Sequence, residues 1–171
     1  MNIKSIIVAL SLSSALLLTG CAGSDTTPAE IITVEQAPVE ETQPTTLAFG
    51  ETYTFDNGAT VTLSSPKPYE ASGLGAAGVV EGQDNLQVTI TIVNSSDESF
   101  DFAGWPTATS GGKDASAIID LANEVGDTQA GTLAAGEEVS WVEAFSVSDT
   151  EDLEITYKPS FLYDAVVFTS K

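Results

Sequence analysis

The stretch Leu86-Gln87-Val88-Thr89-Ile90-Thr91-Ile92 decides the fold class of this chain. Four aliphatic side chains alternate with three polar ones, which is the two-residue period of a strand that has one buried and one solvated face. The same alternation recurs more briefly at residues 59–63 and 153–157, and less regularly at 139–147. Residues 165–169 form a continuous apolar run, which suits a last core strand. We therefore expect an all-β domain.

Turn-forming residues separate these runs. Asn57-Gly58 lies between two alternating segments, and this dipeptide is a strong short-range signal for a β-hairpin. Residues 116–123 alternate less cleanly and could form a short helical turn. Together the spacings predict an immunoglobulin-like antiparallel β-sandwich of seven to eight strands. Trp141 lies mid-strand among apolar neighbours and is predicted to be part of the core, whereas Glu143 interrupts the same apolar face.

The N-terminus has a different pattern. Lys4 precedes an apolar run over 6–18, and small residues follow, which together are the parts of a secretory signal peptide over 1–20. Leu18-Thr19-Gly20-Cys21 resembles the bacterial lipobox, and that resemblance implies that the Cys21 thiol receives diacylglycerol and becomes the first residue of the mature chain. Two alternatives are simple secretion and a membrane span, although the apolar run is shorter than the roughly 20 residues that a spanning helix needs.

Residues 21–46 are predicted to form a disordered linker behind the lipidated cysteine. This segment has no aromatic residue and is rich in Pro, Thr, Glu and Gln, a composition that cannot bury enough apolar surface to fold. The remaining residues, 47–171, have the usual size of one domain. The chain would thus carry its sandwich on a spacer above a membrane.

Charge and composition exclude several functions. The chain has 25 acidic residues against 5 basic ones, a net charge of −20, and no histidine. Nucleic acid is not an expected partner, because its phosphates are bound by Lys and Arg. A chain without histidine has no imidazole base or metal ligand, and its one cysteine is expected to carry acyl chains. We expect no catalytic activity and no cofactor beyond those chains.

The strand and turn residues also carry a family resemblance. Residues 49–53, the strand 58–63, the Asn94–Glu98 end of the long strand, the 136–145 segment and the last strand are similar to an immunoglobulin-like domain family of unknown function. That family is common in secreted and lipidated proteins of Gram-positive bacteria. The resemblance implies the fold and a surface location, and it implies no catalytic or ligand residues.

Trp105 is the candidate ligand contact, because turn formers flank it and an exposed indole can stack on a sugar ring or anchor in a partner. The alternative, favoured by the large apolar area of the ring, is that it folds back to cap the sandwich edge. Calcium is a weak second candidate, with the loop carboxylates Asp149, Glu151 and Asp152 as ligands. We expect these charges to be solvated instead, since they match no calcium-loop motif.

These features predict a lipid-anchored protein on the extracytoplasmic side of a bacterial cell membrane. Its sandwich would bind an extracellular protein or an envelope polymer without catalysis. The alternative is an accessory or structural subunit that docks on an envelope complex through one sheet face. Such a subunit would expose a contiguous apolar patch on a sheet, whereas a binder would gather exposed aromatic residues, including Trp105, on its loops.

Overall fold

The computed structural model describes residues 44–127 and 129–171. Within them the chain forms thirteen strands and one 3-10 helix, η1, so the all-β prediction is confirmed. The elements are β1 (Thr45–Ala48), β2 (Thr52–Thr54), β3 (Ala59–Leu63), β4 (Lys67–Pro68), β5 (Asp84–Asn94), β6 (Phe100–Ala103), β7 (Thr107–Ser110), β8 (Lys113–Asp114), β9 (Ser116–Ile118), η1 (Leu121–Asn123), β10 (Ala130–Leu133), β11 (Glu138–Val147), β12 (Leu153–Tyr157) and β13 (Val166–Thr169).

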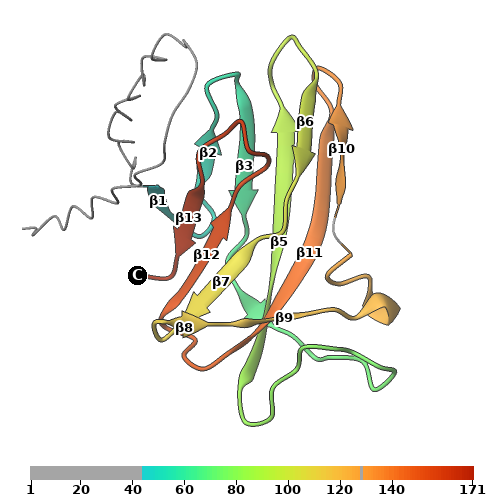
Figure 1. The fold of residues 1–171 in the computed structure, drawn as a ribbon, viewed down its shortest axis with the longest axis vertical. Helices are drawn as coiled ribbons and strands as arrows, with labels where there is room; N and C mark the ends of the chain where they lie inside the picture. The colour runs from blue at the N-terminus through green and yellow to red at the C-terminus, as the bar shows by residue number, and fades with distance from the viewer. Residues whose placement is uncertain (1–43, 128) are drawn as a thin grey trace, which may run out of the picture. The chain divides into compact units, whose positions relative to one another are not determined.

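Two sheets pack face to face (Figure 1). One has the order β2-β3-β5-β11-β9, with the short β4 also paired to β5, and the other has the order β1-β13-β12-β7-β8. Strands β3-β5-β11-β9 follow the A-B-E-D order of an immunoglobulin constant-type domain, and β7-β12-β13 follow its C-F-G order. The predicted sandwich is therefore confirmed, with short extra strands beyond the seven or eight expected. A separate ribbon pairs β6 with β10.

The long central strand β5 contains residues 86–92, whose alternation predicts the fold class. Its even-numbered aliphatic residues from Leu86 to Ile92 are all buried, because alternation turns each of them toward the opposite sheet. The facing layer supplies Ile155, Tyr157 and Phe168, which are fully buried in the same core cluster. Trp141 also lies in this cluster, as predicted.

Two local predictions can be compared with the backbone. Asn57-Gly58 does connect β2 and β3: Gly58 has a φ of 91°, and the Asn57 side-chain oxygen accepts a hydrogen bond from the Ala59 N–H at 3.1 Å. The 116–123 segment divides into β9 and η1, so its irregular pattern reflected a strand followed by one helical turn.

The first strand departs from a purely antiparallel arrangement. β1 begins at Thr45, two residues before the expected start of the domain, and pairs in parallel with β13, with Thr45 opposite Val166. This pairing joins the first described strand to the last one, and alternation within a strand does not reveal it because it depends on the partner's direction. The other strand pairs are antiparallel in the described residues.

Candidate functional site

Cys21 and the lipobox residues Leu18, Thr19 and Gly20 lie outside the described residues, so lipidation stays a prediction from sequence. The same holds for the signal peptide and for most of the linker. No helix in the described ranges has the length and apolar character that crossing a bilayer requires.

Trp105 lies in the connection between β6 and β7 and is 69% exposed, so the alternative in which it caps the sandwich edge is wrong. The backbone beside it packs closely against the end of β12. The Ala103 N–H donates to the Pro159 carbonyl at 2.7 Å, and a Cβ on Gly104 would come within 2.3 Å of the Lys158 oxygen. Only glycine fits this approach, which fixes the residue just before the indole.

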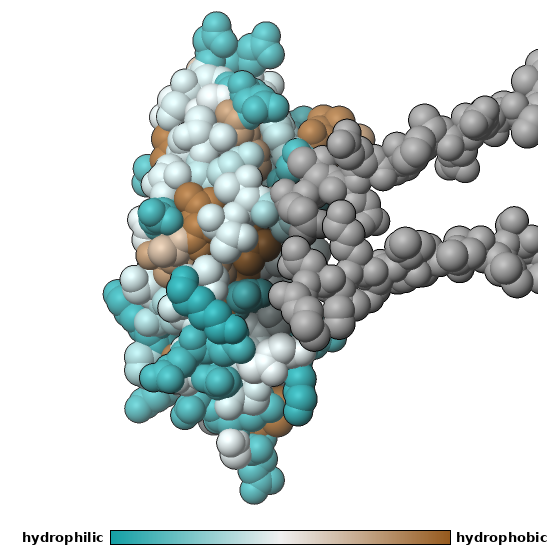
Figure 2. Space-filling view, turned by 90° about the vertical axis from the view of Figure 1, so that its left-hand side faces the viewer, coloured by the Kyte–Doolittle hydropathy of each residue, from teal (hydrophilic) through white to brown (hydrophobic). Residues whose placement is uncertain are grey.

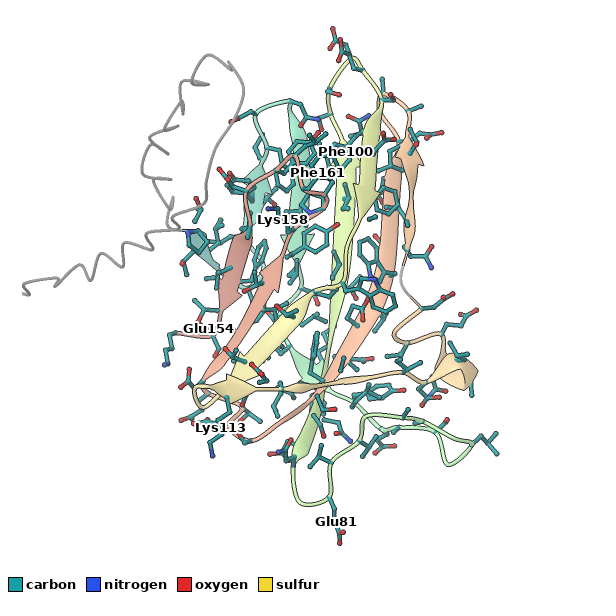
Figure 3. The ribbon with its side chains drawn as sticks, in the orientation of Figure 1. Glu81, Phe100, Lys113, Glu154, Lys158 and Phe161 are labelled. Atoms are coloured by element: carbon teal, nitrogen blue, oxygen red, sulfur yellow. The ribbon has the colours of Figure 1, made fainter. Side chains whose placement is uncertain are left out.

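The connection from β12 to β13 carries a second exposed apolar group. Phe161 is 88% exposed and Leu162 is 73% exposed; Figure 3 shows Phe161 and Lys158 on this connection. We call Trp105, Phe161 and Leu162 the aromatic loop surface, since the backbones that carry them are in contact at residues 103–104 and 158–159. In an immunoglobulin-type domain these connections fall within the segments between strands B and C and between strands F and G.

Tyr163 holds this second loop in place. Its ring lies 5.2 Å from the ring centroids of both Phe55 and Phe100, and its hydroxyl accepts a hydrogen bond from the Asn57 side-chain amide at 3.1 Å. Tyr163 is half-buried and packs against the core, whereas the two residues before it, Phe161 and Leu162, are exposed. Because Tyr163 anchors the loop, Phe161 has less ordering entropy to lose on binding.

A second group of exposed apolar residues surrounds η1 and the loop between β4 and β5. These are Leu74, Val79, Val80, Ile119 and Leu121. Ala77 and Ile119 exchange two backbone hydrogen bonds of 2.9 and 3.0 Å, so the glycine-rich loop 71–80 is joined to the chain after β9 instead of lying apart from it. All the large exposed hydrophobic residues of the described chain lie in connections or in η1, outside the sheet strands.

Asp120 organises the base of this loop. Its carboxylate accepts hydrogen bonds from the Tyr69 hydroxyl at 2.7 Å, from the Ser72 N–H and hydroxyl at 2.6 Å each, and from the Asn123 amide at 3.2 Å. The Ser72 bonds and then the Tyr69 bond lower the pKa of Asp120 to about 2. The group is thus an ionised structural tether, and its donors leave it little capacity to act as a base.

A cleft of about 720 Å³ lies along one edge of β11. We call it the β11 edge cleft. It is lined by Leu121, Asn123, Glu124, Asp127, Gln129, Ser140, Trp141 and Val142. Beside it the Trp141 indole N–H donates to Glu143 at 2.9 Å. Burial raises the pKa of Glu143, and the nearby negative charge of Asp127 adds to that rise, while the indole hydrogen bond opposes it.

The weak calcium candidates are not brought together as ligands. Asp152 forms an ion pair with Lys171 at 2.6 Å, and an Asp149 oxygen accepts the Glu151 N–H at 2.9 Å. Over 44–127 and 129–171, no group of three or more His, Cys, Asp or Glu side chains is arranged to hold a metal ion. The flank shown in Figure 2 is mostly hydrophilic, with separate hydrophobic patches.

Sequence reasoning missed Phe161, Leu162, Asp120 and the cleft. A usable signal existed for the first two, since an apolar pair directly after Pro159-Ser160 is placed in a turn. The Asp120 tether and the cleft arise from contacts across 48 or more residues or between separate segments. No spacing rule reports such contacts.

No family model matches the chain, and no curated protein sequence matches it. Solved structures do resemble its fold. The yjhA protein from Bacillus subtilis is 14% identical, with a TM-score of 0.54, over 71% of this chain and 97% of its own. A secreted protein from Mycobacterium tuberculosis, MPT63, is 17% identical, with a TM-score of 0.52, over 74% of this chain and 98% of its own.

The ycdA protein from Bacillus subtilis, described as a candidate lipoprotein, is 18% identical with a TM-score of 0.55. The match covers 72% of this chain but only 38% of that protein. At these identities the similarity shows a shared β-sandwich fold. It transfers no residue role to this chain.

Proposed function

We propose that this chain is a lipid-anchored bacterial surface protein whose sandwich binds an extracellular protein or envelope polymer through the aromatic loop surface. The observation that carries the proposal is the exposure of Trp105, Phe161 and Leu162 on two connections whose backbones touch. Exposed aromatic residues on a rigid scaffold are typical anchors of recognition surfaces. The lipobox supplies the location, and secreted and lipoprotein neighbours of the same fold support it.

The position of the exposed hydrophobic residues favours recognition by loops over docking through a sheet face. An accessory subunit that docks through one sheet needs a contiguous apolar area on the strands. The large exposed apolar side chains of the described residues lie in connections and in η1. The binding proposal also requires no catalytic group, in keeping with the absence of histidine from the whole chain.

Photo-crosslinking on intact cells tests the binding proposal. A photoreactive phenylalanine analogue replaces Trp105 or Phe161 in the full-length protein, and Asp149, an exposed residue of the β11–β12 connection, is the control. We expect the same adduct from positions 105 and 161 and none from position 149. Identical adducts at all three positions, or none at any, would contradict recognition through this surface.

Metabolic labelling tests the anchor separately. Cys21→Ala should abolish incorporation of a fatty-acid probe and leave the precursor uncleaved, because the only thiol of the chain is then missing. Ser24→Ala, three residues further on, is the matched control and should label as strongly as the natural sequence. Equal labelling of the Cys21→Ala protein would refute the anchor and leave the crosslinking result unaffected.

A further inference from the structure

Strand β11 is paired unequally on its two edges. On one edge it pairs with β5 over its whole length, from Glu138 to Val147. On the other edge β9 covers Ala144–Ser146, and an isolated parallel bridge joins Val142 to Val125, with the Gly126 N–H donating to the Val142 carbonyl at 3.2 Å. No strand among the described residues pairs with the part of this edge from Glu138 to Trp141.

The ladder identifies which backbone groups are free there. In an antiparallel pair the N–H and C=O of alternate residues point away from the partner strand. Because the Val142 carbonyl points away from β5, the N–H and C=O of Ser140 point the same way. The 2.8 Å contact between the Ser140 and Thr91 hydroxyls fits this assignment, since facing side chains approach closely at non-hydrogen-bonded positions. No hydrogen bond to the Ser140 backbone is found within 44–127 and 129–171.

These backbone groups lie in the β11 edge cleft, because Ser140, Trp141 and Val142 belong to its lining. The rest of the lining comes from η1 and the residues that follow it, and it includes Glu124 and Asp127. The lining contains two carboxylates, two amide side chains and an indole, and it contains no basic side chain. The site thus combines a free strand edge with negative charge in a space large enough for side chains.

We propose that the β11 edge cleft binds an extended basic peptide segment of another protein by strand addition. The peptide backbone would pair with the N–H and C=O of Ser140, which is how extended ligands add to an open sheet edge. Its Lys or Arg side chains would reach Glu124 and Asp127, and the net charge of −20 would attract such a segment from a distance. An acidic peptide would be repelled from the same cleft.

This site is distinct from the aromatic loop surface. Its lining shares no residue with Trp105, Phe161 or Leu162. The proposed binding function can therefore fail at one surface and hold at the other, and the crosslinking experiment above does not decide this inference.

The test uses the full-length protein in detergent and capped, fluorescently labelled peptides with an alternating Lys-Val sequence. Fluorescence anisotropy should show saturable binding of the Lys-Val peptide and none of a Glu-Val peptide. A Lys-Val peptide methylated on its backbone nitrogens should bind at least roughly tenfold more weakly, because it cannot donate to the strand edge. Equal binding of the methylated peptide would overturn strand addition.

Variants then locate the site. Asp127→Asn and Glu124→Gln should each weaken binding by about two- to fivefold, the usual effect of one exposed ion pair, whereas the control Asp97→Asn should not. Ser140→Pro removes the free N–H while leaving the pairing to β5 intact, and it should weaken binding further. Hydrogen exchange supplies a readout that does not depend on folding of variants: the Ser140 amide should exchange more slowly with peptide bound. Unchanged exchange, or equal losses for Asp97→Asn and Asp127→Asn, would overturn the proposal.

Discussion

The side chain of Asn94 is expected to contribute more to stability than any other polar group at its end of the sandwich. It is fully buried at the end of β5 and makes four hydrogen bonds. Its amide donates to the Glu98 carbonyl at 2.8 Å and to the Leu133 carbonyl at 2.9 Å. Its oxygen accepts from the N–H and hydroxyl of Ser96 at 3.1 and 2.6 Å. One side chain thus joins β5, the turn after it and β10.

Replacing Asn94 by Ala removes all four bonds. The Leu133 carbonyl would lose its buried donor, whereas the partners at Glu98 and Ser96 lie near solvent and can bind water instead. A buried acceptor left unpaired costs about 1–3 kcal/mol, and each exposed bond contributes a few tenths to about 1 kcal/mol. We therefore expect Asn94→Ala to lower the free energy of unfolding by about 2–4 kcal/mol, which corresponds to a fall in Tm of roughly 6–15 °C for a domain of this size.

Urea denaturation followed by the fluorescence of buried Trp141 measures this change. Ser96→Ala is the matched control, since it loses only bonds near the surface and should cost below about 1 kcal/mol. Asn94→Asp keeps the shape but turns a carboxylate oxygen toward two carbonyls. Its loss should therefore be larger at pH 7 than at pH 3, where the acid is protonated. Equal losses for Asn94→Ala and Ser96→Ala would refute the reasoning.

Three further predictions concern acid, burial and backbone contact. The lowered pKa of Asp120 means that its stabilisation is present above its ordinary value of 3.8 and is lost as the pH falls toward about 2; Asp120→Asn should remove this acid-dependent loss from thermal unfolding curves. Glu143 has a raised pKa, so the folded state holds its proton longer and stability falls as the pH rises above 4.5. Glu143→Gln should therefore raise Tm at pH 7 more than at pH 4. A change in Tm of the same size at both pH values would contradict this. Gly104→Ala places a Cβ against the Lys158 carbonyl and should cost about 1–3 kcal/mol in urea unfolding. Gly73→Ala is its control, because a Cβ there meets no atom within 4 Å and the backbone has no positive φ.

Local pattern predicted the parts of the fold that depend on neighbours in sequence. The alternation over 86–92, the Asn57-Gly58 turn and the burial of Trp141 each follow from a side chain's relation to residues within a few positions. The parallel pairing of β1 with β13 does not, because it joins residues about 120 positions apart. Chain direction at such a distance is decided by the whole topology.

Trp105 shows the same division for the candidate site. Its turn-forming neighbours indicated a loop, and that placement holds. The exposure of the indole could not be predicted in this way, because it depends on how the loop packs against distant residues, as Gly104 does against Lys158, 54 positions further along the chain. Glu143 shows a similar limit. A charged residue on an apolar face indicates either exposure or a specific partner, and only the structure shows that Glu143 is buried with Trp141 as its partner.

The parallel pairing at the start of the domain has a mechanical consequence. With the proposed lipid anchor, a pull transmitted from the membrane would reach the folded domain at Thr45, the first residue of β1. When that pull runs along the strand, the evenly spaced bonds of a parallel ladder share the load and must slip together instead of opening one after another. A tether attached there would load β1 in shear, the direction in which a short strand resists extraction best.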